Sequence, residues 1–265
     1  MTDHDLLRRL RIILSISLWA VANAWSGEAP TTRPASVQVL FLGNSYTYVN
    51  DLPGQLTALA RSLGDAVTTD ASAKGAYRLM NHAQDEQSLA KIRARPWDFV
   101  VLQEQSQYPG FDDWQIERDV APYAVRLDEI IHSANPRAKT IFFAAWGRRD
   151  GDGDNCAIMP AVCTYEGQQR RITRTFERLA GRTSAILAPV GSAWQRIRRS
   201  HPEIGLYQSD GIHPSEAGTY LAACVFYAAL LRKGVLGASP LGLDPAEARI
   251  LQRAAQDSVF SPMRR

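Results

Sequence analysis

Two short segments that lie far apart in the chain hold the residue types of a nucleophilic catalytic site. In the first, Ser45 follows Gly43 and Asn44 at the end of an apolar run, where a buried strand would turn into a helix. In the second, Asp210 stands three residues before His213, so its carboxylate can accept the Nδ1 hydrogen of the imidazole. Each segment alone also fits a turn or a helix cap. Together they predict Ser45 as a nucleophile, His213 as its base and Asp210 as the group that orients the base.

A serine that attacks an ester also needs hydrogen-bond donors for the negatively charged oxygen that develops. The amide of Ser45 would itself point into the crevice, near the start of a helix. Gly75 follows the second apolar run, where a glycine amide can approach closely. The third run ends in an amide-rich stretch, residues 103–107, and a glutamine side chain there could supply a further N–H. The alternative is that these residues only solvate the rim of the crevice.

Several further side chains are candidates for contact with a substrate because they follow the predicted strands. These candidates are Asn44, His82, Tyr108, Trp146 and Arg148. Aromatic rings beside an arginine and glutamines suit a sugar better than a long acyl chain, but such rings can equally pack beneath their loops. His82 likewise either lines the site or packs against it.

The loop after the fourth predicted strand has Asp150, Asp152 and Asp154 at alternate positions, as at the start of a calcium-binding loop. The glycine and the bidentate glutamate that such a loop requires are replaced by Asn155 and Ala161. We therefore predict no metal site, and instead a substrate loop at the mouth of the crevice. A metal- or phosphate-dependent hydrolase centred on the three aspartates is an alternative, although the loop offers no histidine partner.

The elements that position these residues alternate along the chain. We predict strands over 37–42, 66–71, 98–103, 139–145 and 184–188, and helices over 52–63, 85–94, 117–133, 166–179, 190–199, 215–232 and 245–256. This order predicts an α/β fold, a three-layer α/β/α sandwich around a central, mostly five-stranded parallel sheet of the flavodoxin-like kind. Residues 37–265 are predicted to form a single domain. In such sheets, sites form beyond the carboxyl ends of the strands.

The N-terminus has the pattern of an export signal. Arg8, Arg9 and Arg11 precede an apolar run shorter than the roughly 20 residues that span a bilayer, and residues 22–24 form an Ala-x-Ala cleavage site. We predict a signal peptide over 1–24, a linker over 25–36, and a periplasmic or secreted mature protein without stable membrane insertion. A retained membrane anchor is the alternative.

Composition and cysteine usage narrow the class of protein further. The chain has 265 residues, 45% of them hydrophobic, and a formal net charge of +3 without long basic runs, so we predict no nucleic-acid partner. In an oxidising compartment, Cys156 and Cys163 favour a local disulfide that pins the aspartate-rich loop. Cys224 lies in an apolar helix and is predicted to be a buried free thiol.

Taken together, these segments resemble the SGNH (GDSL-type) hydrolase superfamily, over a region from Phe41 to about Leu221. The first family motif, Gly-Asp-Ser, corresponds to the segment ending in Ser45, as in the branch that carries Asn in place of Asp. The Asp-x-x-His motif corresponds to the segment ending in His213, and Gly75 is the candidate for the second motif. The third motif, Gly-x-Asn-Asp, is absent here.

In place of that third motif the sequence resembles subfamilies with a glutamine as donor, and the register points to Gln105. Gln103 or Gln107 would take this role if the strand ended earlier or later. The resemblance implies that the oxyanion is bound by the amides of Ser45 and Gly75 together with this glutamine. It also implies that no metal or organic cofactor is needed.

The predicted function is that of a secreted serine carboxylic ester hydrolase that removes acetyl or other short acyl groups from a carbohydrate. Its partner would be a small-molecule or polysaccharide ester. One alternative is a lipid esterase or lysophospholipase of the same fold, and another is a non-catalytic carbohydrate-binding protein that has kept the fold. The sequence gives no indication of oligomeric state.

Overall fold

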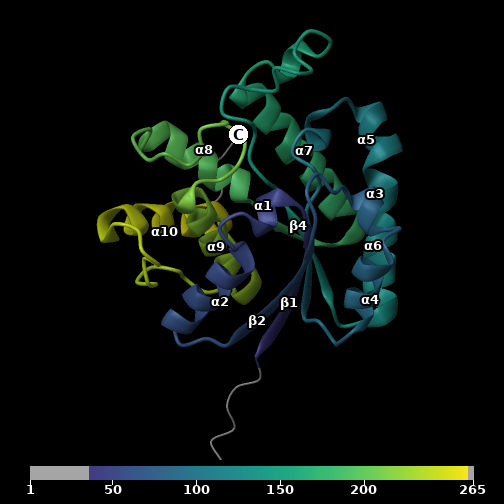
Figure 1. Ribbon diagram of the computed structural model, residues 1–265, viewed down its shortest axis with the longest axis horizontal. Coiled ribbons are helices and arrows are strands. Elements are labelled where there is room, and N and C mark those ends of the chain that lie inside the picture. Colours follow the sequence, from purple (N-terminus) through teal and green to yellow (C-terminus); the bar gives the residue numbers. More distant parts are fainter. Residues whose placement is uncertain (1–35, 262–265) are drawn as a thin grey trace, which may run out of the picture. The chain divides into compact units, whose positions relative to one another are not determined.

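A single five-stranded sheet forms the centre of the protein (Figure 1). The structure is a computed structural model that describes residues 36–261, so the predicted signal peptide and nearly all of the predicted linker lie outside the described residues. All neighbouring strands are parallel, in the order β2-β1-β3-β4-β5. The strands are β1 (Val37–Gly43), β2 (Val67–Ala73), β3 (Phe99–Leu102), β4 (Lys139–Phe143) and β5 (Ile186–Ala188). The predicted five-stranded parallel sheet is thus confirmed.

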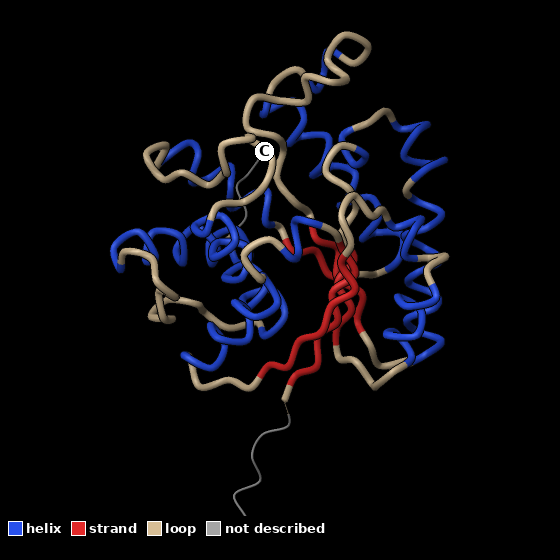
Figure 2. Tube along the Cα trace, in the orientation of Figure 1, coloured by secondary structure: helices blue, strands red, loops and turns tan. Residues whose placement is uncertain are grey.

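Helices cover both faces of the sheet, which gives the predicted three layers (Figure 2). One layer holds α2 (Leu52–Ser62), α8 (Val190–Ser200), α9 (Glu216–Leu231) and α10 (Pro245–Phe260). The other holds α3 (Leu79–His82), α4 (Glu86–Arg93), α5 (Asp113–Asp119), α6 (Ala121–Ala134) and α7 (Tyr165–Thr183). Short elements complete the fold: α1 (Ser45–Tyr48) and the 3₁₀ turns η1 (Tyr108–Gly110) and η2 (Pro160–Val162).

Alternate residues of the central strands explain why both faces are covered. In β1, Val39 and Phe41 pack into the core beneath α9, while Leu40 and Leu42 pack into the opposite core. All four side chains are fully buried, and burying such a side chain contributes roughly 1.5–3 kcal/mol. A strand that is apolar on both faces needs a helical layer on each side.

The largest difference from the predicted elements lies in the segment expected to form one helix over 117–133. It forms two helices, α5 and α6, which meet at Val120. The break follows from Pro122, which has no backbone N–H and whose ring clashes with the preceding turn of a continuous helix. Other ends shift by a few residues, and the short helices α1 and α3 were not predicted because each is only a single turn long.

Two cysteine predictions are confirmed. Cys156 and Cys163 form a disulfide in the long loop between β4 and α7, and Cys224 is a buried free thiol in α9. Burial raises the pKa of the Cys224 thiol far above its ordinary value, so this thiol stays neutral and unreactive. Within residues 36–261, none of the helices combines the length and the apolar character that crossing a bilayer requires.

Candidate active site

Ser45 stands at the carboxyl end of β1, on the turn that leads into α1. Asn44 caps α1, and its side-chain oxygen accepts the backbone N–H of Tyr46 at 3.1 Å. The turn needs Gly43, because a Cβ there would overlap the Thr47 hydroxyl and lie 2.6 Å from Gln103 Oε1. Ser45 is half-buried, and its amide has no hydrogen-bond partner within the described part of the chain. The serine thus presents both a hydroxyl and an unused N–H.

His213 and Asp210 lie beside this serine. The Nε2 atom of His213 is 2.9 Å from Ser45 Oγ, and its Nδ1 is 2.6 Å from Asp210 Oδ2. Because a carboxylate can only accept, Nδ1 carries the hydrogen, so Nε2 is the acceptor for the serine hydroxyl. Partial burial disfavours the charged form of the Asp210 carboxyl group. Hydrogen bonds from the His213 ring and from the backbone amides of Ile212 and His213 favour the charged form more strongly. These bonds hold the pKa of Asp210 below its ordinary value.

The loop that carries His213 is held by groups beyond its own sequence. Gly211 has a φ of +69°, in the left-handed region that favours glycine, and its carbonyl accepts the backbone N–H of Arg149 at 2.8 Å. The indole N–H of Trp146 donates to the Ile212 carbonyl at 3.0 Å. Two contacts therefore connect the loop after β4 to the segment between Asp210 and His213.

Asn50 connects the serine segment to the histidine segment, and sequence reasoning did not identify it. Its side-chain amide donates to the Pro214 carbonyl and to Thr219 Oγ1, each at 3.0 Å. Its φ of +56° is unusual for a residue other than glycine, and asparagine is among the residues that tolerate this region best. That preference is the only signal in the sequence that could have indicated its role.

Gly75 lies in the turn after β2, at the same end of the sheet as Ser45. The β1–β2 ladder pairs Gly43 with Ala73, and the amide of Lys74 extends it by donating to the Gly43 carbonyl at 3.4 Å. Gly75 therefore lies in the turn just beyond this end of the ladder, as Ser45 lies just beyond the end of β1. A Cβ on Gly75 would lie 3.6 Å from the hydroxyl of Tyr48 in α1. Among the described residues, the Gly75 amide has no hydrogen-bond partner.

The structure distinguishes the three candidate glutamines. Gln103 is fully buried, and its Nε2 donates both hydrogens, to Asn44 Oδ1 at 2.9 Å and to the Glu104 carbonyl at 2.7 Å. Gln107 donates from Nε2 to Asp152 and to Asp154, at 3.0 and 3.3 Å. Gln103 and Gln107 thus have no hydrogen to spare.

Gln105 is the glutamine that remains. It is half-buried, and its Nε2 makes one long contact, 3.4 Å to Gln107 Oε1. Its Oε1 accepts the backbone N–H of Gln107 at 2.9 Å, which fixes the plane of the amide. One N–H of Gln105 is therefore available for another acceptor.

A buried carboxylic acid stands between Gln103 and Gln105. The side chain of Glu104 is fully buried, and its Oε1 accepts the amide of Gln105 at 2.7 Å and lies 3.7 Å from Arg78 Nε. Burial raises the pKa of Glu104 to about 7, although the Gln105 amide and the charge of Arg78 act in the opposite direction. Glu104 thus holds the backbone at Gln105, where the segment after β3 enters the site. The sequence analysis did not identify Glu104.

Three of the predicted substrate contacts are corrected by the structure. Asn44 is buried. Its side-chain Nδ2 donates to the Tyr77 carbonyl, and its Oδ1 accepts hydrogen bonds from the Tyr46 amide and from Gln103 Nε2. His82 is fully buried, where its Nε2 donates to the Gly43 carbonyl at 3.0 Å and Nδ1 lies 2.8 Å from Ser88 Oγ. Burial lowers the pKa of His82 to about 4, so its ring is neutral and supports the turn before the serine.

Trp146 is the third correction. Its ring is fully buried, stacked between Tyr46 and Trp194 at centroid distances of 4.3 and 4.0 Å. The alternative that loop aromatics pack beneath their loops therefore holds for Trp146. Trp146 instead packs against the ring of Tyr46, next to Ser45, and donates a hydrogen bond to the Ile212 carbonyl, next to His213.

Tyr108 and Arg148 keep partly exposed surfaces. The guanidinium of Arg78 covers one face of the Tyr108 ring at 3.4 Å from its centroid. Arg148 donates to Asp152 Oδ1 at 3.1 Å and to Asp154 Oδ2 at 2.8 Å. A guanidinium thus holds two of the three aspartates that resembled a calcium loop, which disfavours a cation there. Over residues 36–261, no group of three or more His, Cys, Asp or Glu could hold a metal ion.

Several solved structures have a fold similar to that of this chain. A DUF4886 family protein from Bacteroides uniformis has a TM-score of 0.72 at 18% identity, over 86% of this chain and 96% of that one. A protein from Slackia heliotrinireducens proposed to be an SGNH hydrolase has a TM-score of 0.60 at 27% identity, over 74% of this chain and 100% of the other. An acetylxylan esterase from Geobacillus stearothermophilus has a TM-score of 0.50 at 15% identity, over 75% and 96% of the two chains.

No protein-family model matches the sequence, and neither does any curated protein. The fold and its structural neighbours, SGNH and GDSL hydrolases among them, nevertheless agree with the sequence-based resemblance. The chain has the three-layer α/β/α fold of the SGNH hydrolases.

Proposed function

We propose that this protein is a serine carboxylic ester hydrolase with Ser45, His213 and Asp210 as its catalytic triad. The observation that carries the proposal is the continuous hydrogen-bonded line from Asp210 Oδ2 through the imidazole to Ser45 Oγ, with steps of 2.6 and 2.9 Å. Three residues from two distant segments meet in the order and at the distances that activation of a serine requires.

The proposed reaction proceeds through an acyl-enzyme in two steps. Ser45 Oγ attacks the ester carbonyl while its proton moves to Nε2 of His213, and Asp210 stabilises the resulting imidazolium. His213 then protonates the departing alkoxide, which leaves as the alcohol. In the second step His213 takes a proton from water, and the hydroxide equivalent attacks the acyl-enzyme to release a carboxylic acid and restore the Ser45 hydroxyl.

The oxyanion of both steps would be stabilised by three donors with unused hydrogens. These are the backbone amides of Ser45 and Gly75 and the Nε2 of Gln105. Preorganised donors of this kind do not have to reorient as charge develops, and each contributes about 2.7–4 kcal/mol to catalysis. No step of this mechanism requires a metal or an organic cofactor.

For the substrate, we propose an acetyl or other short acyl ester of a carbohydrate, and for the protein a periplasmic or secreted location. The half-buried Gln105, together with the partly exposed Tyr108 and Arg148, offers polar groups and a ring at the edge of the site. Such groups suit sugar hydroxyls better than a long alkyl chain. The disulfide between Cys156 and Cys163 supports an oxidising compartment.

The proposal is tested with the purified mature protein and 4-nitrophenyl acetate. Wild-type protein should hydrolyse the ester, and Ser45→Ala and His213→Ala should each lower kcat by about 10⁴–10⁶-fold with unchanged melting temperatures. Ser133→Ala, an exposed serine on α6, is the matched control and should keep full activity. Full activity of Ser45→Ala would refute the mechanism.

The same preparation distinguishes the alternatives for the substrate. Acetylated oligosaccharides and 4-nitrophenyl palmitate should differ strongly in kcat/KM, in favour of the former. A preference for the palmitate ester would favour a lipid esterase. Binding of oligosaccharides without turnover of any ester would favour the non-catalytic carbohydrate-binding alternative.

A further inference from the structure

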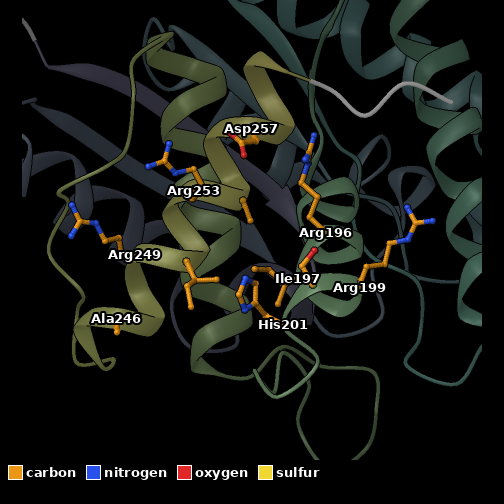
Figure 3. Close-up of a pocket in the computed structure, with 11 residues that line it drawn as sticks. Arg196, Ile197, Arg199, His201, Ala246, Arg249, Arg253 and Asp257 are labelled. Atoms are coloured by element: carbon orange, nitrogen blue, oxygen red, sulfur yellow. The ribbon is translucent and has the colours of Figure 1, made fainter.

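A cavity of about 620 Å³ lies between α8 and α10, and none of the residues of the candidate active site lines it (Figure 3). An ester bound at Ser45 must therefore be oriented by side chains around the serine itself. One side chain beside the serine, that of Tyr48, has no role in the mechanism given above.

Tyr48 borders the nucleophile. It is the last residue of α1, the single helical turn that begins with Ser45. Residues three apart on a helix have Cβ atoms about 5–6 Å apart, so the two side chains leave the helix next to each other. The Tyr48 hydroxyl extends toward the turn after β2, where a Cβ on Gly75 would lie 3.6 Å from it. The tyrosine thus reaches from the segment of the nucleophile to the turn that carries a proposed oxyanion donor.

The ring of Tyr48 is exposed and has no partner. Tyr48 is 49% exposed, and two other aromatic residues of the described chain, Trp114 and Phe260, are 61% and 40% exposed. Each of those two rings is covered by a guanidinium, that of Arg118 at 4.8 Å and that of Arg232 at 5.3 Å. Within residues 36–261, the side chain of Tyr48 has no hydrogen bond, ring contact or cation contact. Its ring and hydroxyl are therefore free to contact a substrate.

The surface next to this ring is polar. The turn that the Tyr48 hydroxyl approaches, residues 74–77, begins with Lys74 and has two exposed residues at its centre. The segment after α1 continues with Asn50 and Asp51. A long alkyl chain that passed over the ring would next meet these polar groups, and burying them without hydrogen bonds is unfavourable. A sugar, by contrast, has C–H groups on its faces and oxygens along its edges.

We propose that Tyr48 determines specificity for the sugar part of the substrate, with one face of a pyranose ring against the tyrosine ring and a sugar oxygen at its hydroxyl. Tyrosine suits this role because it combines an apolar ring with a polar tip. An acetyl group is small enough to be held at Ser45 and the oxyanion donors, so the alcohol part of the ester is what contacts Tyr48. This inference rests on the proposed function, since it concerns an ester bound at Ser45.

Two acetate esters with different alcohol parts test the proposal. Glucose pentaacetate contains a pyranose ring, and glycerol triacetate has the same acyl group on an open-chain alcohol. In Tyr48→Ala the ratio of kcat/KM for the glucose ester to kcat/KM for the glycerol ester should fall about tenfold, mainly through a higher KM for the glucose ester. Tyr48→Phe keeps the ring and should keep this ratio within about threefold of the wild-type value. An unchanged ratio in Tyr48→Ala, or an equal fall in Tyr48→Phe, would overturn the proposal.

Phe260→Ala is the matched control, because it removes a similarly exposed ring far from the site. The Phe260 ring contacts Arg232, which follows α9, whereas His213 precedes α9. The 16 residues of this helix span about 24 Å. Phe260→Ala should therefore keep the wild-type ratio for the two esters.

Calorimetric titration of Ser45→Ala with glucose pentaacetate separates this inference from the proposed function. Ser45→Ala should bind the ester without hydrolysing it, and the double variant Ser45→Ala and Tyr48→Ala should bind it about tenfold more weakly. If the wild type hydrolysed neither ester, the proposed function would fail. If the single and the double variant bound the glucose ester equally, the role of Tyr48 would be disproved whatever the activity of the wild type.

Discussion

Replacing neighbouring glutamines should separate stability from catalysis. In Gln103→Leu, a fully buried amide with four hydrogen bonds becomes a side chain that makes none. The backbone amide of Asn44 and the carbonyl of Glu104 lose partners at 2.8 and 2.7 Å. Each buried group left unpaired costs about 1–3 kcal/mol, so we expect about 3–5 kcal/mol of lost stability. For a domain of this size that lowers the melting temperature by about 10 °C.

The substitution Gln105→Ala should instead leave the stability nearly unchanged and lower kcat. Gln105 is half-buried and its Nε2 makes only a contact of 3.4 Å, so its removal should cost at most about 1 kcal/mol of stability. Loss of one oxyanion donor, by contrast, lowers kcat about 10²–10³-fold. KM should change little, because the hydrogen bond strengthens only as charge develops on the oxygen.

Thermal unfolding by circular dichroism and steady-state kinetics with 4-nitrophenyl acetate measure the two effects separately. Kinetics of both variants are compared at 15–20 °C below the lower of their melting points, where each is folded. If Gln105→Ala kept its kcat, Gln105 would not be an oxyanion donor. If Gln103→Leu then lost activity while fully folded, the reaction would depend on the contact of Gln103 with Asn44 beside Ser45, and not on a donor at Gln105.

Three further predictions follow from buried or cross-linked groups near the site. Glu104 has a raised pKa, so the folded state holds a proton that the unfolded state loses. The free energy of unfolding of the wild type should therefore fall by an amount on the order of 3 kcal/mol as pH rises from about 4.5 to 7. Urea unfolding at several pH values measures this fall, and Glu104→Gln should remove most of it. Removing the disulfide with the Cys156→Ser and Cys163→Ser double variant should cost about 2–3 kcal/mol in the same assay. Trp146→Phe keeps the ring stack but loses the bond to the Ile212 carbonyl, so kcat should fall several-fold with little change in KM.

The fold and the contact between Asp210 and His213 could be predicted from the sequence because each depends on a local pattern. Short apolar runs that alternate with amphipathic helices specify a covered parallel sheet whatever the identity of the loops. The spacing of Asp210 and His213 brings a carboxylate to the ring nitrogen within one turn, so this contact needs little tertiary information. Ser45 is placed by the end of β1, and the last five residues of β1 are all buried.

The positions of the side chains around the site could not be predicted from the sequence, because they depend on contacts between distant segments. Trp146 follows β4 as a rim residue would, but the rings of Tyr46 and Trp194 enclose it. His82 is a polar residue after β2, and only the position of the Gly43 carbonyl determines that it faces inward. Neither neighbour can be inferred from the local sequence.

The departure from the third family motif has a physical explanation in the structure. The side-chain amide of Gln103 forms hydrogen bonds with the backbone and the side chain of the cap residue Asn44, and in this way joins the end of β3 to the segment that carries Ser45. Glu104 turns inward and binds the amide of Gln105, which brings the next side chain to the surface of the crevice. Two buried polar residues thus position one partly exposed amide. The stretch can therefore supply a donor without the usual Gly-x-Asn-Asp sequence. This arrangement requires a buried carboxylic acid, Glu104, whose pKa is raised to about 7. The pH dependence of the stability of Glu104→Gln therefore also tests whether Glu104 holds the Gln105 donor in place.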